Sequence, residues 1–161
     1  MATTVTPATL TVTLTESITL NGVDHGGTNS FTFSSINEVY KRIVTIPASN
    51  DTTIAEFQTS AHTSNNAIDL EDVRYIRVTN LDDTNPVTLS LQVAGGEGGT
   101  ANMSTSVLLE AGKNFVLGTV HDGIALDDDA ASIVASLNDL ESILVDSGSN
   151  AVDLEIFVAS V

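Results

Sequence analysis

Hydrophobic and polar residues alternate along residues 8–20. Leucine, valine and isoleucine occupy even positions, and threonine or serine occupies the odd ones. Because side chains leave a β-strand on opposite faces with a period of two, this stretch predicts a strand with one aliphatic and one hydroxyl face. Glu16 interrupts the aliphatic series, which indicates a bulge, a bend or an edge at this point.

Shorter apolar runs recur along the rest of the chain, with turn-forming residues between them. We expect strands at 30–34, 39–46, 52–59, 73–79, 87–93, 104–109, 114–117, 143–145 and 152–158. The run 39–46 has apolar residues on both faces, which predicts burial on both sides for part of its length, and Pro47 ends it.

Two turns rich in Asp, Asn, Gly and Pro predict hairpins. Residues 81–86 would join the strands 73–79 and 87–93. Residues 110–113 would likewise join the strands 104–109 and 114–117.

One stretch has helical spacing. Ile133, Leu137, Leu140 and Leu144 recur three or four residues apart, and acidic residues 127–129 could cap a short helix near 130–140. With many short strands around it, we expect a single all-β domain over residues 1–161. The architecture is an antiparallel two-sheet β-sandwich, jelly-roll-like, with at most that one helix, because most connections are long enough to cross between sheets.

Composition excludes several classes of partner and of chemistry. The chain has 161 residues, 42% of them hydrophobic, which suits one domain with a real core. Five Lys and Arg face 21 Asp and Glu, giving a net charge of −16 that opposes binding to nucleic acid and to anionic membranes. The absence of cysteine excludes disulfides and zinc thiolates. With neither a secretory signal nor a long apolar span, we expect a soluble protein that folds in the cytoplasm and is not exported by the usual route.

Few residues offer catalytic or metal chemistry. His25 and His121 each adjoin an aspartate in a turn, and a metal site there would require the two loops to converge; His62 has no evident partner. Residues 127–129 read as a solvated turn or helix cap rather than a calcium loop, and the glycines of 95–99 as a hairpin tip rather than a phosphate cradle. We therefore predict no enzyme, no cofactor and no metal.

Two features suggest partner contacts. Arg74 and Arg77 are two of very few cations, so each is expected to pair with a carboxylate, within the fold or across a subunit contact. Residues 1–7 form either an extended arm or a frayed tail. They include an uncharged, β-prone segment that is suited to pairing with a neighbouring strand. This segment consists of Thr3, Thr4, Val5, Thr6 and Pro7.

Several strand-and-turn motifs carry a family resemblance. Residues 73–82 with Asn85, Val87 and Leu89, then 110–117, 137–143 and 152–160, together with the Thr-rich start, resemble β-sandwich virion structural proteins of marine tailed phages. These proteins include capsid decoration proteins and components of tails and baseplates. The resemblance covers most of the chain and carries no catalytic residue with it.

The resemblance implies a function and a location. We expect a capsid decoration (cement) protein of the virion, assembled in the host cytoplasm. It would bind the outer surface of the major capsid shell and stabilise it. Its partners would be the major capsid protein and further copies of itself, as a dimer or trimer. The alternative is a tail or baseplate component, or a receptor- or carbohydrate-binding β-sandwich module.

Overall fold

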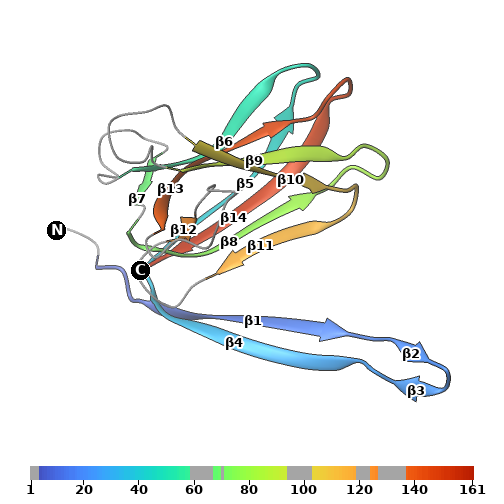
Figure 1. Cartoon of the computed structure of the whole chain (residues 1–161). Coiled ribbons are helices and arrows are strands. Elements are labelled where there is room, and N and C mark those ends of the chain that lie inside the picture. The colour runs from blue at the N-terminus through green and yellow to red at the C-terminus, as the bar shows by residue number, and fades with distance from the viewer. Residues whose placement is uncertain (1–3, 59–66, 70, 94–102, 119–123, 127–136) are drawn as a thin grey trace.

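The described part of the protein is built from β-strands and contains no helix. A computed structural model describes residues 4–58, 67–69, 71–93, 103–118, 124–126 and 137–161, and Figure 1 shows their arrangement. The all-β class predicted from the sequence is confirmed. Within the region of helical spacing, residues 138–140 belong to a strand instead, and residues 127–136 lie outside the described part.

Two sheets pack face to face as a β-sandwich. Sheet I has the strand order β11-β8-β14-β5, with bounds β5 (Glu38–Ile46), β8 (Val73–Asn80), β11 (Asn114–Gly118) and β14 (Val152–Ser160). Sheet II has the order β10-β9-β13-β6-β7, with bounds β6 (Asp51–Gln58), β7 (Ala67–Asp69), β9 (Val87–Val93), β10 (Met103–Leu109) and β13 (Asn138–Asp146). The short β12 (Ala125–Leu126) also pairs with β13. All these pairings are antiparallel except that of β6 with β7.

The order of the eight longer strands of these two sheets is that of a jelly roll. Four connections, at 47–50, 81–86, 110–113 and 147–151, each lead from a strand of one sheet to a strand of the other. Along the chain from β5 to β14, four strands of sheet I and four of sheet II alternate, except that β9 and β10 are consecutive neighbours in sheet II. This is the double-sheet arrangement of jelly rolls. The jelly-roll-like sandwich expected from the sequence is confirmed.

The hairpins predicted around the turns 81–86 and 110–113 are wrong. β8 pairs with β11 and β14, and β9 pairs with β10 and β13, so the turn at 81–86 bridges the two sheets. The turn at 110–113 does the same between β10 and β11. Turn-forming residues signal a reversal of the chain, but they do not determine whether the next strand pairs beside the last one or lies about 10 Å away in the facing sheet.

The space between the sheets is filled mainly by aliphatic side chains. Alternate residues of every long strand point inward, and those fully buried include Ile46, Ile76, Leu89, Ile143 and Leu154. Asn80 is buried beside them and donates its side-chain amide to the carbonyl oxygens of Asn85 (2.9 Å) and Leu109 (3.3 Å). This residue therefore fixes two of the inter-sheet connections to the core.

β5 is an edge strand. It pairs with β14 on one side, and Val39 and Ile43 on its outer face are exposed. The expectation that this strand is buried on both faces is therefore wrong. Its second apolar face is on the surface of the molecule, and Pro47 follows its last residue as predicted.

The N-terminal strands leave the sandwich as a separate hairpin, which we call the arm (residues 8–36). It is distinct from the extended arm predicted over residues 1–7. β1 (Ala8–Glu16) pairs with β4 (Gly27–Ile36), and β2 (Thr19–Leu20) pairs with β3 (Val23–Asp24) at the tip. Asn21 and Gly22 close the tip with φ of 51° and 79°, as the two-residue hairpin turn of type I′ requires. The strand predicted over 8–20 is interrupted: β1 ends at Glu16, where the sequence indicated a bulge, a bend or an edge, and β2 begins at Thr19.

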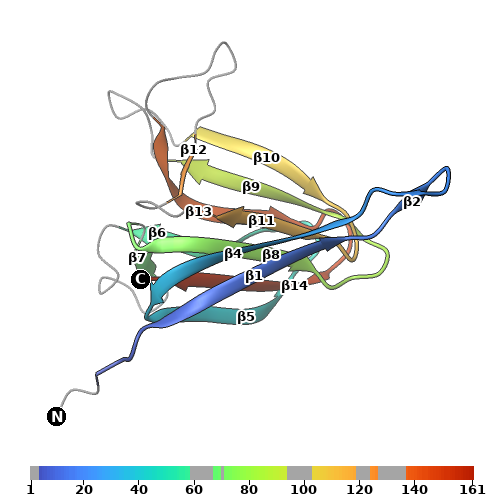
Figure 2. The ribbon, with the colours of Figure 1, turned by 90° about the horizontal axis from the view of Figure 1, so that it is seen from below.

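The base of the arm packs on the outer face of sheet I. Phe33 and Ile36 of β4 are buried there against Tyr75 of β8 and Ala159 of β14. The Phe33 ring lies 5.8 Å from the Tyr75 ring and 5.6 Å from that of Phe31, measured between centroids. Farther out, β1 and β4 diverge from the sandwich and their tip projects past it (Figures 1 and 2).

Candidate interaction surfaces

The distal half of the arm exposes large aliphatic side chains. Four of them are more than half accessible to solvent: Leu14 (57%), Ile18 (54%), Leu20 (57%) and Val23 (56%). In β1 the same aliphatic face that is half-buried at Leu10 and Val12 continues outward to Leu14, beyond the support of sheet I. The apolar face of the arm is therefore packed on sheet I near the base and exposed to solvent farther out.

The opposite face of the arm is a ladder of hydroxyl groups. Thr13 Oγ1 lies 3.0 Å from Ser30 Oγ, and Thr15 Oγ1 lies 3.3 Å from Thr28 Oγ1, each pair joining β1 to β4. At the tip, His25 N–H donates to the Ile18 carbonyl at 2.9 Å. These contacts hold the ribbon together and keep its two faces chemically different.

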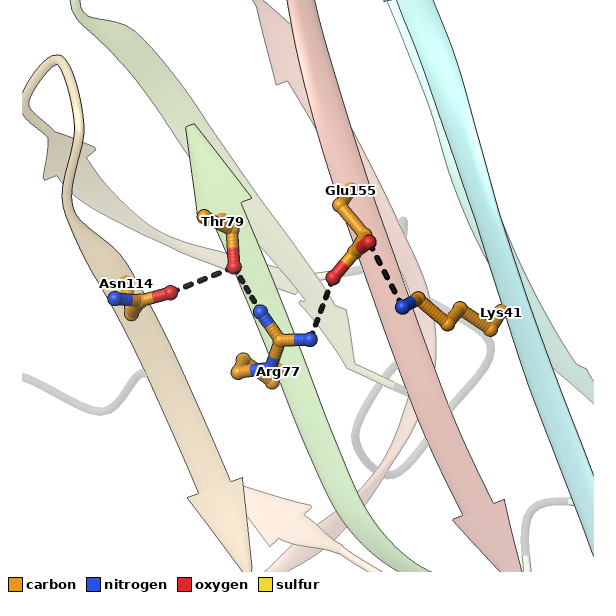
Figure 3. Close-up of polar contacts among 5 residues, drawn as sticks. All are labelled: Lys41, Arg77, Thr79, Asn114 and Glu155. Atoms are coloured by element: carbon orange, nitrogen blue, oxygen red, sulfur yellow. Dashed lines mark hydrogen bonds and ion pairs between the residues drawn. The ribbon is translucent and has the colours of Figure 1, made fainter. Parts of the chain in front are cut away.

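A line of polar contacts crosses the outer face of sheet I (Figure 3). Arg77 of β8 donates to Glu155 of β14 at 2.6 Å, and the Lys41 ammonium of β5 lies 3.1 Å from the other oxygen of that carboxylate. Arg77 also donates to Thr79, whose hydroxyl donates to the Asn114 side-chain oxygen at 2.6 Å. Side chains from all four strands of the sheet are thereby linked.

The Glu155 carboxylate is the centre of this network. Hydrogen bonds from Arg77 and then from Lys41 lower the pKa of Glu155 below its ordinary value, because both favour the charged form. Arg77, a predicted partner contact, thus pairs with a carboxylate inside the fold. The partner is 78 residues away in the sequence, so only the fold brings the two together.

The other predicted contact residues lie elsewhere. Arg74 donates to the main-chain carbonyls of Glu71 (2.7 Å) and Val73 (3.3 Å), and it lines a surface hollow together with Ser34 at the base of the arm. Thr4, Val5, Thr6 and Pro7 are exposed and form no strand, whereas Thr3 lies outside the described residues. The N-terminal segment and the two arginines therefore do not form a single site.

Sequence reasoning missed the aliphatic residues at the arm tip. The signal was present, because Asn21-Gly22 flanked by Leu20 and Val23 is a strong short-range indication of a hairpin. The pattern does not predict the direction in which the hairpin leaves the domain.

The candidate metal and phosphate residues fall largely outside the described part. His62, His121, residues 127–129 and the glycines 95–99 all lie there, and His25 is near the arm tip. Among the residues that are described, no group of three or more His, Asp or Glu side chains is placed to hold a metal ion. Within the same residues, no helix is long and apolar enough to cross a membrane.

Comparisons with known proteins assign no family to this chain. No protein-family model matches the sequence, and no curated protein matches it. A solved structure described under "Bacillus endospore appendages form a novel family of disulfide-linked pili" aligns with 76% of this chain and 88% of its own, at 11% sequence identity and a TM-score of 0.37.

Proposed function

We propose that this chain is a structural subunit of a virus particle, specifically a decoration protein that binds the outer surface of a phage capsid shell and stabilises it. The observation that carries the proposal is the arm, whose distal half leaves its own domain with four exposed aliphatic side chains. The resemblance of the strand-and-turn motifs to phage virion proteins supports the same function, and the jelly roll is a fold that capsid domains share with others.

An unsupported arm of this kind favours assembly. A two-stranded hairpin alone is marginally stable in water, so its distal half gains stability when a second surface covers it. Contiguous exposed aliphatic residues mark protein contact sites in soluble proteins. Burying a side chain such as Leu20 against a partner would contribute about 1.5–3 kcal/mol if burial were complete. We therefore assign the arm to contacts within the particle.

The charge of the chain restricts what the arm binds. A net charge of −16 repels phosphate backbones and anionic lipid, and so favours a protein partner over nucleic acid or an anionic membrane. We propose the major capsid protein and neighbouring copies of this chain as those partners, with assembly in the host cytoplasm. The exposed segment Thr4–Pro7 beside the arm base offers a second contact with the shell.

Shortening the arm tests the proposal. Glu16 pairs with Gly27 in the β1–β4 register, so an Asn-Gly turn can replace residues 17–26 and close the hairpin. The variant loses Ile18, Leu20 and Val23 but keeps the packed base. We expect its melting temperature to stay near that of the wild type and its occupancy on purified particles to fall several-fold.

A matched control keeps the length of the arm and changes the hydroxyl face instead. Replacing Thr13 and Thr15 by Ser retains the hydroxyl ladder, so occupancy should be unchanged. Full occupancy of the shortened variant would show that the arm does not attach the protein to the particle and would overturn the proposal.

A further inference from the structure

Two exposed strands of this protein carry the same alternating pattern with opposite charge. On β5, the exposed Val39 and Ile43 flank Lys41 on the outer face of sheet I. On the arm, the exposed Leu14 and Ile18 flank Glu16, which is the last residue of β1, so Ile18 lies two residues beyond that strand. Each segment thus presents an aliphatic residue, a charge and an aliphatic residue at a spacing of two. The charge is basic on β5 and acidic on β1.

Both strands have a free edge. β5 pairs with β14 on one side, and β1 pairs with β4 on one side. In the part of the chain that the structure describes, no strand pairs with the second edge of either one. Figure 2 shows β5 at the margin of sheet I. Free edges present unpaired N–H and C=O groups, which makes them templates for pairing with another strand.

We propose that the arm of one copy pairs through β1 with the β5 edge of a second copy, and so extends its sheet I. When Glu16 lies beside Lys41 and the pairing continues past the end of β1 to Ile18, the residues two positions away on either side are aliphatic in both segments. This holds for either strand direction, because both patterns are symmetric about the charge. The contact therefore combines main-chain hydrogen bonds with two aliphatic pairs and one ion pair.

Charge complementarity is the reason to name a second copy as the occupant. The chain has five Lys and Arg, and two of them, Lys41 and Arg42, are adjacent on this edge strand. The arm, in contrast, carries Glu16 and Asp24 near its tip and no Lys or Arg. The most basic edge of the protein thus matches its acidic, apolar arm, although the net charge of −16 opposes association elsewhere.

The contact is head-to-tail, since an arm binds an edge and each copy offers both. Such an interface closes into a ring or continues as an array, depending on the rotation between copies. The inference rests on the proposed function, because copies held on a shell have a high local concentration that favours a weak contact. Neighbouring subunits would then be linked across the shell surface.

Charge reversal on the two strands tests the pairing. Self-association of the purified protein is measured by sedimentation velocity over a range of concentrations for wild type, E16K, K41E and the double variant E16K/K41E. Each single reversal places like charges opposite each other and should weaken association roughly fivefold. The double variant restores opposite charges and should associate like the wild type.

Matched controls carry the same charge changes on the exposed turn that joins β10 to β11. E110K and K113E should leave association within about twofold of the wild type, since a change in net charge alone has a small effect. Melting temperatures of all variants are compared, because K41E also removes the ion pair with Glu155.

Three results would overturn the inference: a wild type that stays monomeric at every concentration, single reversals that match the controls, or a double variant no better than the singles. The proposed function is tested separately by occupancy on particles. If the shortened arm lowers occupancy while charge reversal leaves self-association unchanged, the arm binds the shell and the β5 pairing is wrong.

Discussion

Phe33 holds the arm on the sandwich, and replacing it with alanine should release the arm without unfolding the domain. The side chain is 4% exposed and contacts the rings of Phe31 and Tyr75. Truncating a buried phenylalanine in this way costs about 3–5 kcal/mol. Each of the two aromatic contacts contributes about 0.5–1.5 kcal/mol beyond area burial. That loss is large for a two-stranded ribbon, which has little stability of its own.

Hydrogen exchange read by mass spectrometry resolves the effect along the chain. In Phe33→Ala, amides of β1 and β4 should exchange much faster, while those of β9 and β13 in sheet II keep their protection. Phe57→Ala is the matched control, because Phe57 is equally buried but belongs to the core between the sheets. It should lower the melting temperature of the whole sandwich by more than Phe33→Ala does.

Two results would refute this reasoning. If the amides of the arm are protected equally well in Phe33→Ala and in the wild type, other contacts hold the arm on the sandwich. Equal loss of protection in the arm and in sheet II would mean that the arm and the sandwich unfold as one unit.

Four further predictions follow from the network, the core and the surface. Glu155→Gln should lower the melting temperature at neutral pH, and the difference from wild type should shrink below about pH 4, because the lowered pKa of Glu155 means that its contribution is lost as pH falls; a constant difference across a pH series would contradict this. Asn80→Ala should destabilise the domain by about 1–3 kcal/mol in urea titrations, since it leaves the Leu109 and Asn85 carbonyls without their donor; an unchanged midpoint would show that water replaces it. Treatment with EDTA should leave the melting temperature unchanged, and a shift of several degrees would reveal a bound metal ion. Deleting residues 2–7 should reduce occupancy on particles without changing the melting temperature of the isolated protein; full occupancy would place the shell contact elsewhere.

The sequence was informative wherever a pattern is local. The strand over 87–93 was predicted with its observed bounds, and Pro47 and Glu16 marked strand ends, because alternation and the missing proline N–H act within a few residues. The assignment of strands to sheets was not local. Whether β8 pairs with β9 depends on the filling of the core between the sheets, to which distant strands contribute.

The candidate surfaces were predictable only in part. Arg77 was expected to pair with a carboxylate and does so with Glu155, but nothing local identifies a partner 78 residues away. The Thr-rich strand was recognised as having two faces, yet its departure from the sandwich is set by the docking of Phe33 on sheet I. Periodicity cannot distinguish an aliphatic face that is buried in the domain from one that continues into solvent, as β1 does at Leu14.

Quantitative mass spectrometry of purified virus particles tests the central claim most directly. A decoration protein should be present in a simple ratio to the major capsid protein, and it should be lost together with shell stability when its arm is shortened. Absence of the protein from particles would contradict a virion function altogether. A copy number matching the tail proteins instead of the shell would contradict the assignment to the capsid surface.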